Sequence, residues 1–224
     1  MTTTSSPPRK AMLAGSTGLI GSALLPMLCD SPRYDEVHAL VRRTPPAGLA
    51  AHGKARVHTV DFARLPQDLP GVDDVYVALG TTIKVAGSRE AFRQVDLDHV
   101  VSTARVARAG GATRLAVVSA LGASAGSRIF YNRVKGEMQA AVAALGFESV
   151  VIAQPSLLVG DRAALGQPVR PGEVWGERLF APIRWLVPRG LRPIEARDVA
   201  AAMLVATLEG APGVHVLASA AMQP

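Results

Sequence analysis

The sequence predicts an α/β domain built around a doubly wound, mostly parallel sheet. Short β-branched or apolar runs alternate with longer helical patterns along the 224 residues, which is the order expected of βαβ units. The uniformly apolar run at 75–79 predicts a strand buried on both faces, as strands of a parallel sheet are. We expect a single domain over residues 1–224, in which the Pro- and Gly-rich stretch at about 160–193 forms a small C-terminal lobe that covers the substrate.

The expected strands and helices alternate through the chain. Apolar runs predict strands at 10–14, 37–41, 56–60, 75–79, 115–119, 150–153 and 214–217. Helical periodicity predicts helices at 19–29, 88–109, 131–145 and 198–208. Gly110 and Gly111 are a stop signal for the second helix and Gly146 for the third, while Asp198 suits the positive end of the last helix.

The composition is that of a globular protein, with 49% hydrophobic and 19% charged residues. Cys29 is the only cysteine, so no internal disulfide can form and a reducing compartment fits best. The first ten residues lack the apolar core of a signal peptide, and no later segment has the roughly 20 unbroken apolar residues of a membrane helix. We therefore expect a cytoplasmic protein with no membrane span.

The formal net charge of +6 does not by itself predict nucleic-acid binding. The arginines are scattered and form no run of five or more basic residues, whereas a cofactor with several phosphates would be attracted by the same charge. The histidines share no metal-ligand spacing, so no metal site is expected; they are His38, His52, His58, His99 and His215.

A glycine-rich turn lies between the first predicted strand and the first predicted helix. Its residues are Gly15, Ser16, Thr17, Gly18, Leu19, Ile20 and Gly21. Gly15 permits a tight turn, Gly18 lets the backbone approach a pyrophosphate, and Gly21 lets helix and strand pack closely. Free backbone N–H groups and the helix dipole would attract the phosphates, so the turn predicts a Rossmann-type dinucleotide site. The alternative is an ordinary flexible turn.

The end of the second predicted strand indicates which dinucleotide is bound. NAD-specific folds carry an acidic residue there, but this chain has Arg42 and Arg43. A pair of guanidinium groups can form charge-assisted, bidentate bonds to a 2′-phosphate. We therefore favour NADP(H) over NAD(H) as the cofactor, the alternative being two solvated surface arginines.

Tyr131 and Lys135 are four residues apart, which places them on one face of a predicted helix. Ser119 ends the fifth predicted strand, at the carboxyl edge where doubly wound sheets bind ligands. An adjacent cation favours the charged form of a phenol, which can then exchange a proton with a carbonyl or alcohol oxygen. The serine hydroxyl can hold that oxygen. The alternative is a packed tyrosine beside a solvated lysine.

The order of these features resembles the short-chain dehydrogenase/reductase superfamily across nearly the whole chain. More narrowly, the chain resembles the atypical branch related to the mammalian Tat-interacting protein, whose members are often described as NAD(P)-binding or sugar-epimerase-like. The residues that carry this resemblance are 78–82, 84–88, Phe92, Val95, Asp96, Asp98, 118–123, Phe130, Tyr131, 135–137 and 154–158.

The resemblance implies roles for individual residues. Ser119, Tyr131 and Lys135 would be the catalytic trio, with Lys135 also binding the cofactor ribose. Asp61 and Phe62 would bracket the adenine. Leu79, Gly80, Thr81 and Thr82 would line the ribose and phosphate path, and Pro155, Ser156, Leu157 and Leu158 would flank the nicotinamide. Asp96 stands where the superfamily often has an asparagine that arranges a proton-relay water, so this chain departs from the residues of the usual relay.

These residues predict an NADP(H)-dependent oxidoreductase acting on a small carbonyl compound or alcohol. One alternative is a regulatory or redox-sensing protein that binds NADPH with little catalysis, and another is an epimerase-like enzyme, although 224 residues leave little room for a nucleotide-sugar domain. The expected partner is a small-molecule substrate. The apolar stripe formed by Trp175, Leu179, Phe180, Ile183 and Leu186 is expected to be a substrate lid or packing element, or otherwise a homodimer surface.

Overall fold

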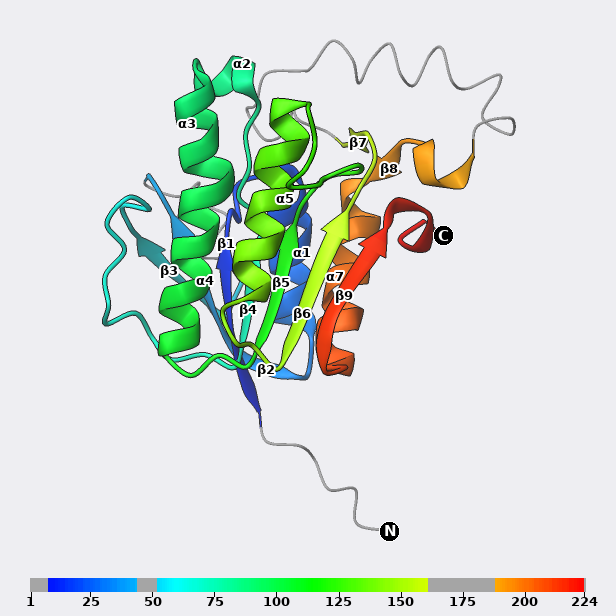
Figure 1. The fold of residues 1–224 in the computed structure, drawn as a ribbon. Helices are drawn as coiled ribbons and strands as arrows, with labels where there is room; N and C mark the ends of the chain where they lie inside the picture. The colour runs from blue at the N-terminus through cyan, green and yellow to red at the C-terminus, as the bar shows by residue number, and fades with distance from the viewer. Residues whose placement is uncertain (1–7, 44–51, 161–187, 224) are drawn as a thin grey trace.

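A computed structural model describes residues 8–43, 52–160 and 188–223 of the chain. Its centre is a seven-stranded parallel sheet in the order β3-β2-β1-β4-β5-β6-β9 (Figure 1). The strands are β1 (Arg9–Ala14), β2 (Tyr34–Val41), β3 (Ala55–Thr59), β4 (Asp74–Val77), β5 (Arg114–Val118), β6 (Ser149–Gln154) and β9 (Gly213–Ala218). The order reverses between β1 and β4, which confirms the predicted doubly wound fold.

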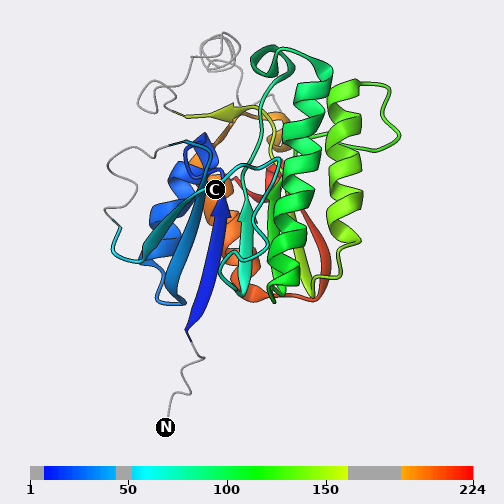
Figure 2. The ribbon, with the colours of Figure 1, turned by 90° about the vertical axis from the view of Figure 1, so that its left-hand side faces the viewer.

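Helices cover both faces of the sheet, so the domain has three layers (Figures 1 and 2). One face carries α1 (Leu19–Asp30) and α7 (Ala196–Glu209), which pack against each other. The other face carries α4 (Val100–Ala109) and α5 (Phe130–Ala143). Each face has its own apolar core, because successive side chains of a buried strand point to opposite sides.

β1 shows how the sequence produces this arrangement. Met12 and Ala14 lie in the core under α4 and α5, whereas Ala11 and Leu13 lie in the core under α1 and α7. All four side chains are buried, so the strand is apolar without alternation, as expected between two helical layers.

The predicted helix at 88–109 is continuous in the structure but changes its helical type in the middle. It consists of α3 (Arg89–Arg93), a π-helix, η2 (Gln94–His99), and α4, in unbroken succession. The Ser88 hydroxyl caps α3 by accepting a hydrogen bond from the N–H of Ala91 at 3.0 Å. Within the π-helix both Asp96 and Leu97 are buried. Short π-helical turns are frequent at functional sites, and this one carries a carboxylate into the interior.

Several short elements of the described residues were not expected from the sequence. The helix α2 (Ile83–Ala86) begins at Thr82, whose side chain caps it, and ends at Gly87 with a φ of 88°. β7 (Leu158–Val159) and β8 (Ile194–Glu195) pair in a separate two-stranded sheet. Elements of two to four residues are too short to produce a periodic pattern.

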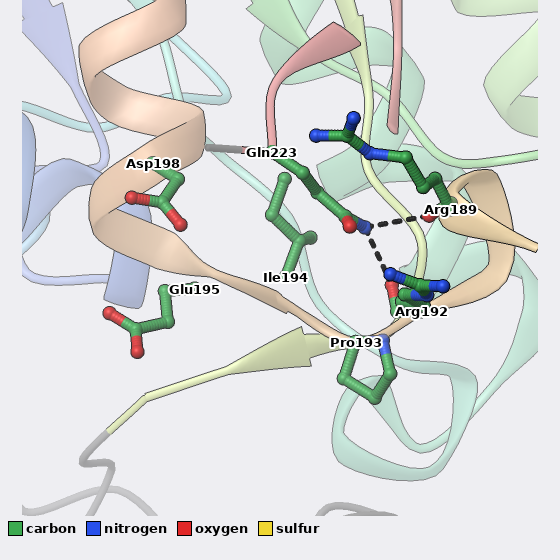
Figure 3. A pocket seen from close by; sticks show the side chains of 7 residues that line it. All are labelled: Arg189, Arg192, Pro193, Ile194, Glu195, Asp198 and Gln223. Carbon is green, nitrogen blue, oxygen red and sulfur yellow. Dashed lines mark hydrogen bonds between the residues drawn. The ribbon is translucent and has the colours of Figure 1, made fainter. Parts of the chain in front are cut away.

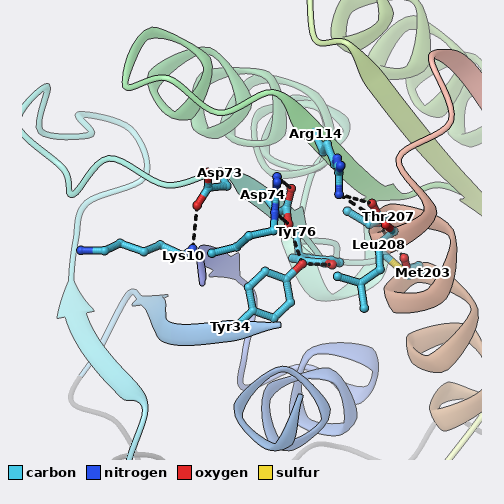
Figure 4. Close-up of polar contacts among 10 residues, drawn as sticks. Lys10, Tyr34, Asp73, Asp74, Tyr76, Arg114, Met203, Thr207 and Leu208 are labelled. Carbon is cyan, nitrogen blue, oxygen red and sulfur yellow. Dashed lines mark hydrogen bonds and ion pairs between the residues drawn. The ribbon is translucent and has the colours of Figure 1, made fainter. Parts of the chain in front are cut away.

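A buried polar network ties the amino ends of three strands together (Figure 4). The Arg9 guanidinium binds both carboxylate oxygens of Asp74, at 2.6 and 2.9 Å. The Tyr34 hydroxyl donates to Asp74 at 2.7 Å and lies 2.8 Å from the Tyr76 hydroxyl. Burial raises the pKa of Tyr34 far above that of a free phenol, so the hydroxyl stays a donor. The network lies at the edge of the sheet opposite the glycine turn.

Of the predicted lobe at 160–193, residues 161–187 lie outside the described part of the chain, and so does the apolar stripe at 175–186. The described remainder contains the short helix η4 (Arg189–Leu191) and β8. Within the described ranges, no helix combines the length and the apolar character needed to cross a membrane.

Candidate functional site

The glycine turn lies where the sheet order reverses, in contact with the chain that follows β4. Gly15 has a φ of 94°, and a Cβ at this position would lie 2.6 Å from the carbonyl oxygen of Ala78. A Cβ on Gly21 would lie only 2.0 Å from the carbonyl oxygen of Gly15. The Gly18 N–H donates to that same oxygen at 2.9 Å. Side chains are thus sterically excluded at Gly15 and Gly21, in a turn that lies at the crevice where doubly wound sheets bind ligands.

The start of α1 fits the phosphates of a dinucleotide. Gly18 is the N-cap and offers no side-chain cap, and the first turn contains no acidic residue. The first N–H groups of a helix lack intrahelical partners and attract anions. The buried Ser16 hydroxyl has no hydrogen-bond partner within the described residues, although a buried hydroxyl normally has one. Both features suit a phosphate held against this turn.

The predicted adenine side of the site brings Arg42, Asp61 and Phe62 into one region around His99. Arg42 and Arg43 are exposed directly after β2, and Phe62 is buried after β3. The Phe62 ring lies 6.1 Å from the ring of His99. Burial lowers the pKa of His99 and the Arg42 charge lowers it further, whereas Asp98 and Asp61 oppose these effects. Sequence reasoning missed His99, because only the fold brings its helix next to Phe62.

Lys135 and Asp96 form a buried ion pair at the carboxyl end of β5. The Lys135 ammonium lies 2.8 Å from Asp96 Oδ1, and the two side chains are only 3% and 1% exposed. Asp96 Oδ2 accepts the N–H of Thr81 at 2.8 Å, and the ammonium also donates to the Val118 carbonyl oxygen at 3.4 Å. Asp96 is therefore a counter-ion for Lys135 and an anchor for the chain after β4.

Tyr131 lies one helical turn before Lys135 on α5, as predicted. It is half-buried, and its ring lies 5.2 Å from that of Phe92. Ser119 directly follows β5, where its N–H donates to the Ala153 carbonyl oxygen at 2.7 Å. The structure thus brings Ser119, Tyr131 and Lys135 to the same edge of the sheet as the glycine turn.

Sequence reasoning missed Gln139, which forms a hydrogen bond with the Ser119 hydroxyl. Gln139 Nε2 donates to Ser119 Oγ at 2.5 Å, and Gln139 Oε1 accepts from Gln154 Nε2 at 3.3 Å. The spacing of Tyr131, Lys135 and Gln139 could have revealed it, because residues four apart share a helix face.

The segment after β6 lies beside the loop that follows β5. The Leu121 N–H donates to the Pro155 carbonyl oxygen at 2.9 Å. The Ser156 hydroxyl donates to the carbonyl oxygen of Arg192 and accepts from the hydroxyl of Ser219 at 2.9 Å. The residues expected to flank a nicotinamide therefore lie at the same edge of the sheet as the glycine turn, held by the chain around β8.

The described surface has hollows, of which two bear on the site. One of about 400 Å³ is lined by Arg189, Arg192, Pro193, Ile194, Glu195, Asp198 and Gln223 (Figure 3). The Gln223 amide donates to the carbonyl oxygens of Arg189 and Arg192 at its rim. The other, of about 470 Å³, lies between Phe62 and the outer side of α4. Tyr131 lines neither. The described residues contain no group of three or more His, Cys, Asp or Glu placed to bind a metal.

The sequence matches the NAD(P)H-binding family over residues 15–157. It is 37% identical over 156 residues to "Protein FMP52, mitochondrial" of Eremothecium gossypii, which covers 68% of this chain and 67% of that protein. The corresponding protein of Candida albicans is 32% identical and covers 84% and 82%. "Protein HTATIP2" of Rattus norvegicus is 33% identical over 175 residues, with coverages of 77% and 70%.

Solved structures agree with the fold. MoeE5 in complex with UDP-glucose and NAD superimposes with a TM-score of 0.70 over 93% of this chain and 75% of that one, at 18% identity. ADP-L-glycero-D-manno-heptose-6-epimerase of Helicobacter pylori also gives a TM-score of 0.70, over 94% and 77%, at 14% identity. At these identities the likeness supports the Rossmann-like architecture alone.

The expected cytoplasmic location is contradicted by the relatives. The proteins from Eremothecium gossypii, Candida albicans and other fungi are named mitochondrial. The expectation rested on a single cysteine and on the lack of a secretory signal. Neither observation distinguishes the cytoplasm from an organelle whose targeting segments are polar and amphipathic.

Proposed function

Because the chain belongs to the NAD(P)H-binding family, we propose that it is an NADP(H)-dependent oxidoreductase that acts on a carbonyl compound or an alcohol. The observation that carries this proposal is the position of Tyr131, Lys135 and Ser119. They lie at the carboxyl edge of β5 and at the start of α5, on the same edge of the sheet as the glycine turn.

Each part of the cofactor has a matching part of the chain. The glycine turn and the start of α1 would hold the pyrophosphate, and Arg42 and Arg43 the 2′-phosphate. Phe62 would lie against the adenine, residues 79–82 along the ribose and phosphate path, and residues 155–158 beside the nicotinamide. A bound nicotinamide would supply or accept a hydride.

The side chains around the substrate oxygen would transfer the proton that accompanies the hydride. Tyr131 would donate a proton to a carbonyl oxygen in reduction, or take one from an alcohol in oxidation. Lys135 would stabilise the phenolate by its charge and bind the cofactor ribose. Ser119 would donate a hydrogen bond from its hydroxyl to the substrate oxygen. Its bond to Gln139 leaves the hydroxyl proton available, because the hydroxyl is the acceptor in that bond.

Calorimetric titration with NADPH and, separately, with NADH tests the cofactor assignment. We expect tighter binding of NADPH, and in Arg42→Ala/Arg43→Ala a weakening confined to NADPH. Charged hydrogen bonds contribute about 1.5–3 kcal/mol each, so the loss should be at least tenfold. Equal affinity of this double variant and the parent protein for NADPH would refute the assignment. For catalysis, Tyr131→Phe should abolish turnover of carbonyl substrates while NADPH affinity stays unchanged.

The second candidate is an NADPH-binding regulatory or redox-sensing protein with little turnover. This candidate is favoured because two of the proposed catalytic side chains already have partners within the protein: Lys135 is paired with Asp96, and Ser119 is hydrogen-bonded to Gln139. The same experiments separate the two candidates. Tight NADPH binding without turnover of any carbonyl compound in a broad panel would support the regulatory function.

A further inference from the structure

Large apolar side chains are exposed around the candidate site. Val85, Leu121, Ile129, Leu157 and Leu191 are between 39% and 63% exposed. They belong to five different segments, each of which follows the carboxyl end of a strand or lies beside one, at the top of the view in Figure 1. We call these five residues the apolar rim. Single exposed apolar residues are ordinary, but a group beside a ligand site indicates what contacts it.

Backbone contacts bring three members of the apolar rim together. Leu121 donates its N–H to the Pro155 carbonyl oxygen at 2.9 Å, so it lies beside the segment that contains Leu157. The Leu157 carbonyl oxygen accepts the N–H of Ile194 at 2.9 Å. The neighbouring Ser156 hydroxyl binds the Arg192 carbonyl oxygen, next to Leu191. This side of the rim therefore continues from the loop after β5 to η4.

The other two members lie close to the proposed catalytic residues. Ile129 is the N-cap of α5, two residues before Tyr131. The loop after β5 lies directly on this helix, because a Cβ on Gly136 would be 2.1 Å from the backbone of that loop. Val85 donates its N–H to the Thr82 hydroxyl at 3.2 Å, in the segment anchored to the ion pair of Asp96 and Lys135. Ile129 and the loop that contains Leu121 thus lie beside the start of α5, where Tyr131 is located.

Charged side chains stand beside three members of the rim in the sequence, since Lys84, Arg128 and Arg192 adjoin Val85, Ile129 and Leu191, but not beside Leu121 or Leu157. Residues 119–127 and 155–159 contain no charged side chain, so two of the segments that form the rim are neutral. The hollow beside Leu191 carries charges of both signs, with Arg189 and Arg192 facing Glu195 and Asp198 (Figure 3). A diphosphate would meet carboxylates there as well as guanidinium groups. Along the two neutral segments a hydrocarbon chain would meet no charged side chain of those segments.

We propose that the substrate is an apolar carbonyl compound, or the corresponding alcohol, whose hydrocarbon chain lies along the apolar rim. This inference rests on the proposed oxidoreductase function and specifies its substrate class. Burying one methylene against apolar side chains improves affinity by up to about fourfold, and by less where the rim stays partly open to water. Affinity should therefore rise by about two- to fourfold with each added methylene until the chain extends beyond the rim.

The test measures binding separately from activity. Secondary alcohols from 2-butanol to 2-nonanol are titrated calorimetrically into the protein saturated with NADPH. They cannot turn over, because the alcohol and NADPH are both already reduced. Turnover of the matching 2-ketones with NADPH is measured in parallel. We expect the dissociation constants of the alcohols to fall steadily with chain length, and kcat/KM of the ketones to rise by a similar factor.

Ile129→Ser and Leu121→Ser should each weaken the binding of 2-nonanol, together by about tenfold, and leave 2-butanol unchanged. Val205→Ser is the matched control, because Val205 is 57% exposed on α7 and lies outside the rim. Affinities independent of chain length, or equal losses in the control and rim variants, would overturn the inference and point to a protein-docking role for the rim. Failure to bind NADPH in the first titration would overturn the proposed function and this inference with it.

Discussion

Replacing Asp96 by asparagine tests the buried ion pair at the centre of the candidate site. The side chains have nearly the same shape, and the asparagine oxygen can still accept the N–H of Thr81. What is lost is the negative charge 2.8 Å from the Lys135 ammonium, which is only 3% exposed. The remaining contact of the ammonium is the Val118 carbonyl oxygen at 3.4 Å, so a buried cation would be left without a counter-ion.

The expected loss of stability follows from this geometry. Removing one partner of a buried ion pair typically destabilises a protein by about 3–5 kcal/mol. Because the single asparagine oxygen that accepts the Thr81 N–H leaves the NH2 group facing the ammonium, we expect Asp96→Asn to lower the free energy of unfolding by about 3–5 kcal/mol. For a domain of 150–250 residues, this corresponds to a decrease in Tm of about 6–20 °C.

Urea denaturation, followed by far-UV circular dichroism, measures the loss. Asp98→Asn is the matched control, since Asp98 is an exposed carboxylate two residues away in the same π-helix, and it should change stability by less than about 0.5 kcal/mol. Lys135→Met should destabilise strongly by itself, whereas the double variant Asp96→Asn/Lys135→Met should be more stable than either single one. Single losses that simply add in the double variant would refute the idea that the pair acts as a unit.

The remaining predictions concern the turn, the buried network and pH. Gly21→Ala should unfold the protein or abolish NADPH binding, because the added Cβ would lie 2.0 Å from the Gly15 carbonyl oxygen. Gly53→Ala is the control: no atom lies within 4 Å of its added Cβ, so urea denaturation and NADPH titration should both give the values of the parent protein. Tyr34→Phe should cost about 1.5–3 kcal/mol in urea denaturation by removing a buried bond to the Asp74 carboxylate, and an unchanged midpoint would show that the network contributes nothing. Burial, followed by the charge of a neighbouring histidine, lowers the pKa of His38 below the value of about 6.5 in the unfolded chain. The unfolded state therefore binds more protons as pH falls, and stability should decrease from about pH 6.5 down to the lowered pKa, with a weaker decrease in His38→Gln.

The sequence predicted the centre of the sheet well, because the central strands β1, β4, β5 and β6 lie between two helical layers and contain unbroken apolar runs, whereas the edge strands β3 and β9 are partly exposed. The run at 75–79, for example, corresponds to β4, which is buried on both faces. The strand ends were less accurate, since polar residues such as Asp74 belong to the strand but contribute no apolar signal. Asp74 is buried because Arg9 and Tyr34 satisfy its oxygens, and both are distant in sequence.

The sequence also indicated that Asp96 and Lys135 are buried charges, but not that they pair with each other. Phe92, Asp96 and Val100 are spaced by four residues, so a carboxylate interrupts an otherwise buried helix face. Lys135 interrupts the buried face of α5 in the same way, between Val134 and Met138. Charges in such places need partners of opposite sign, since an unpaired buried charge is very costly. Spacing along one helix therefore shows that each residue requires a partner. Only the packing of η2 against α5 shows that they are partners of each other, and the same packing sets the Lys135 ammonium at the carboxyl end of β5.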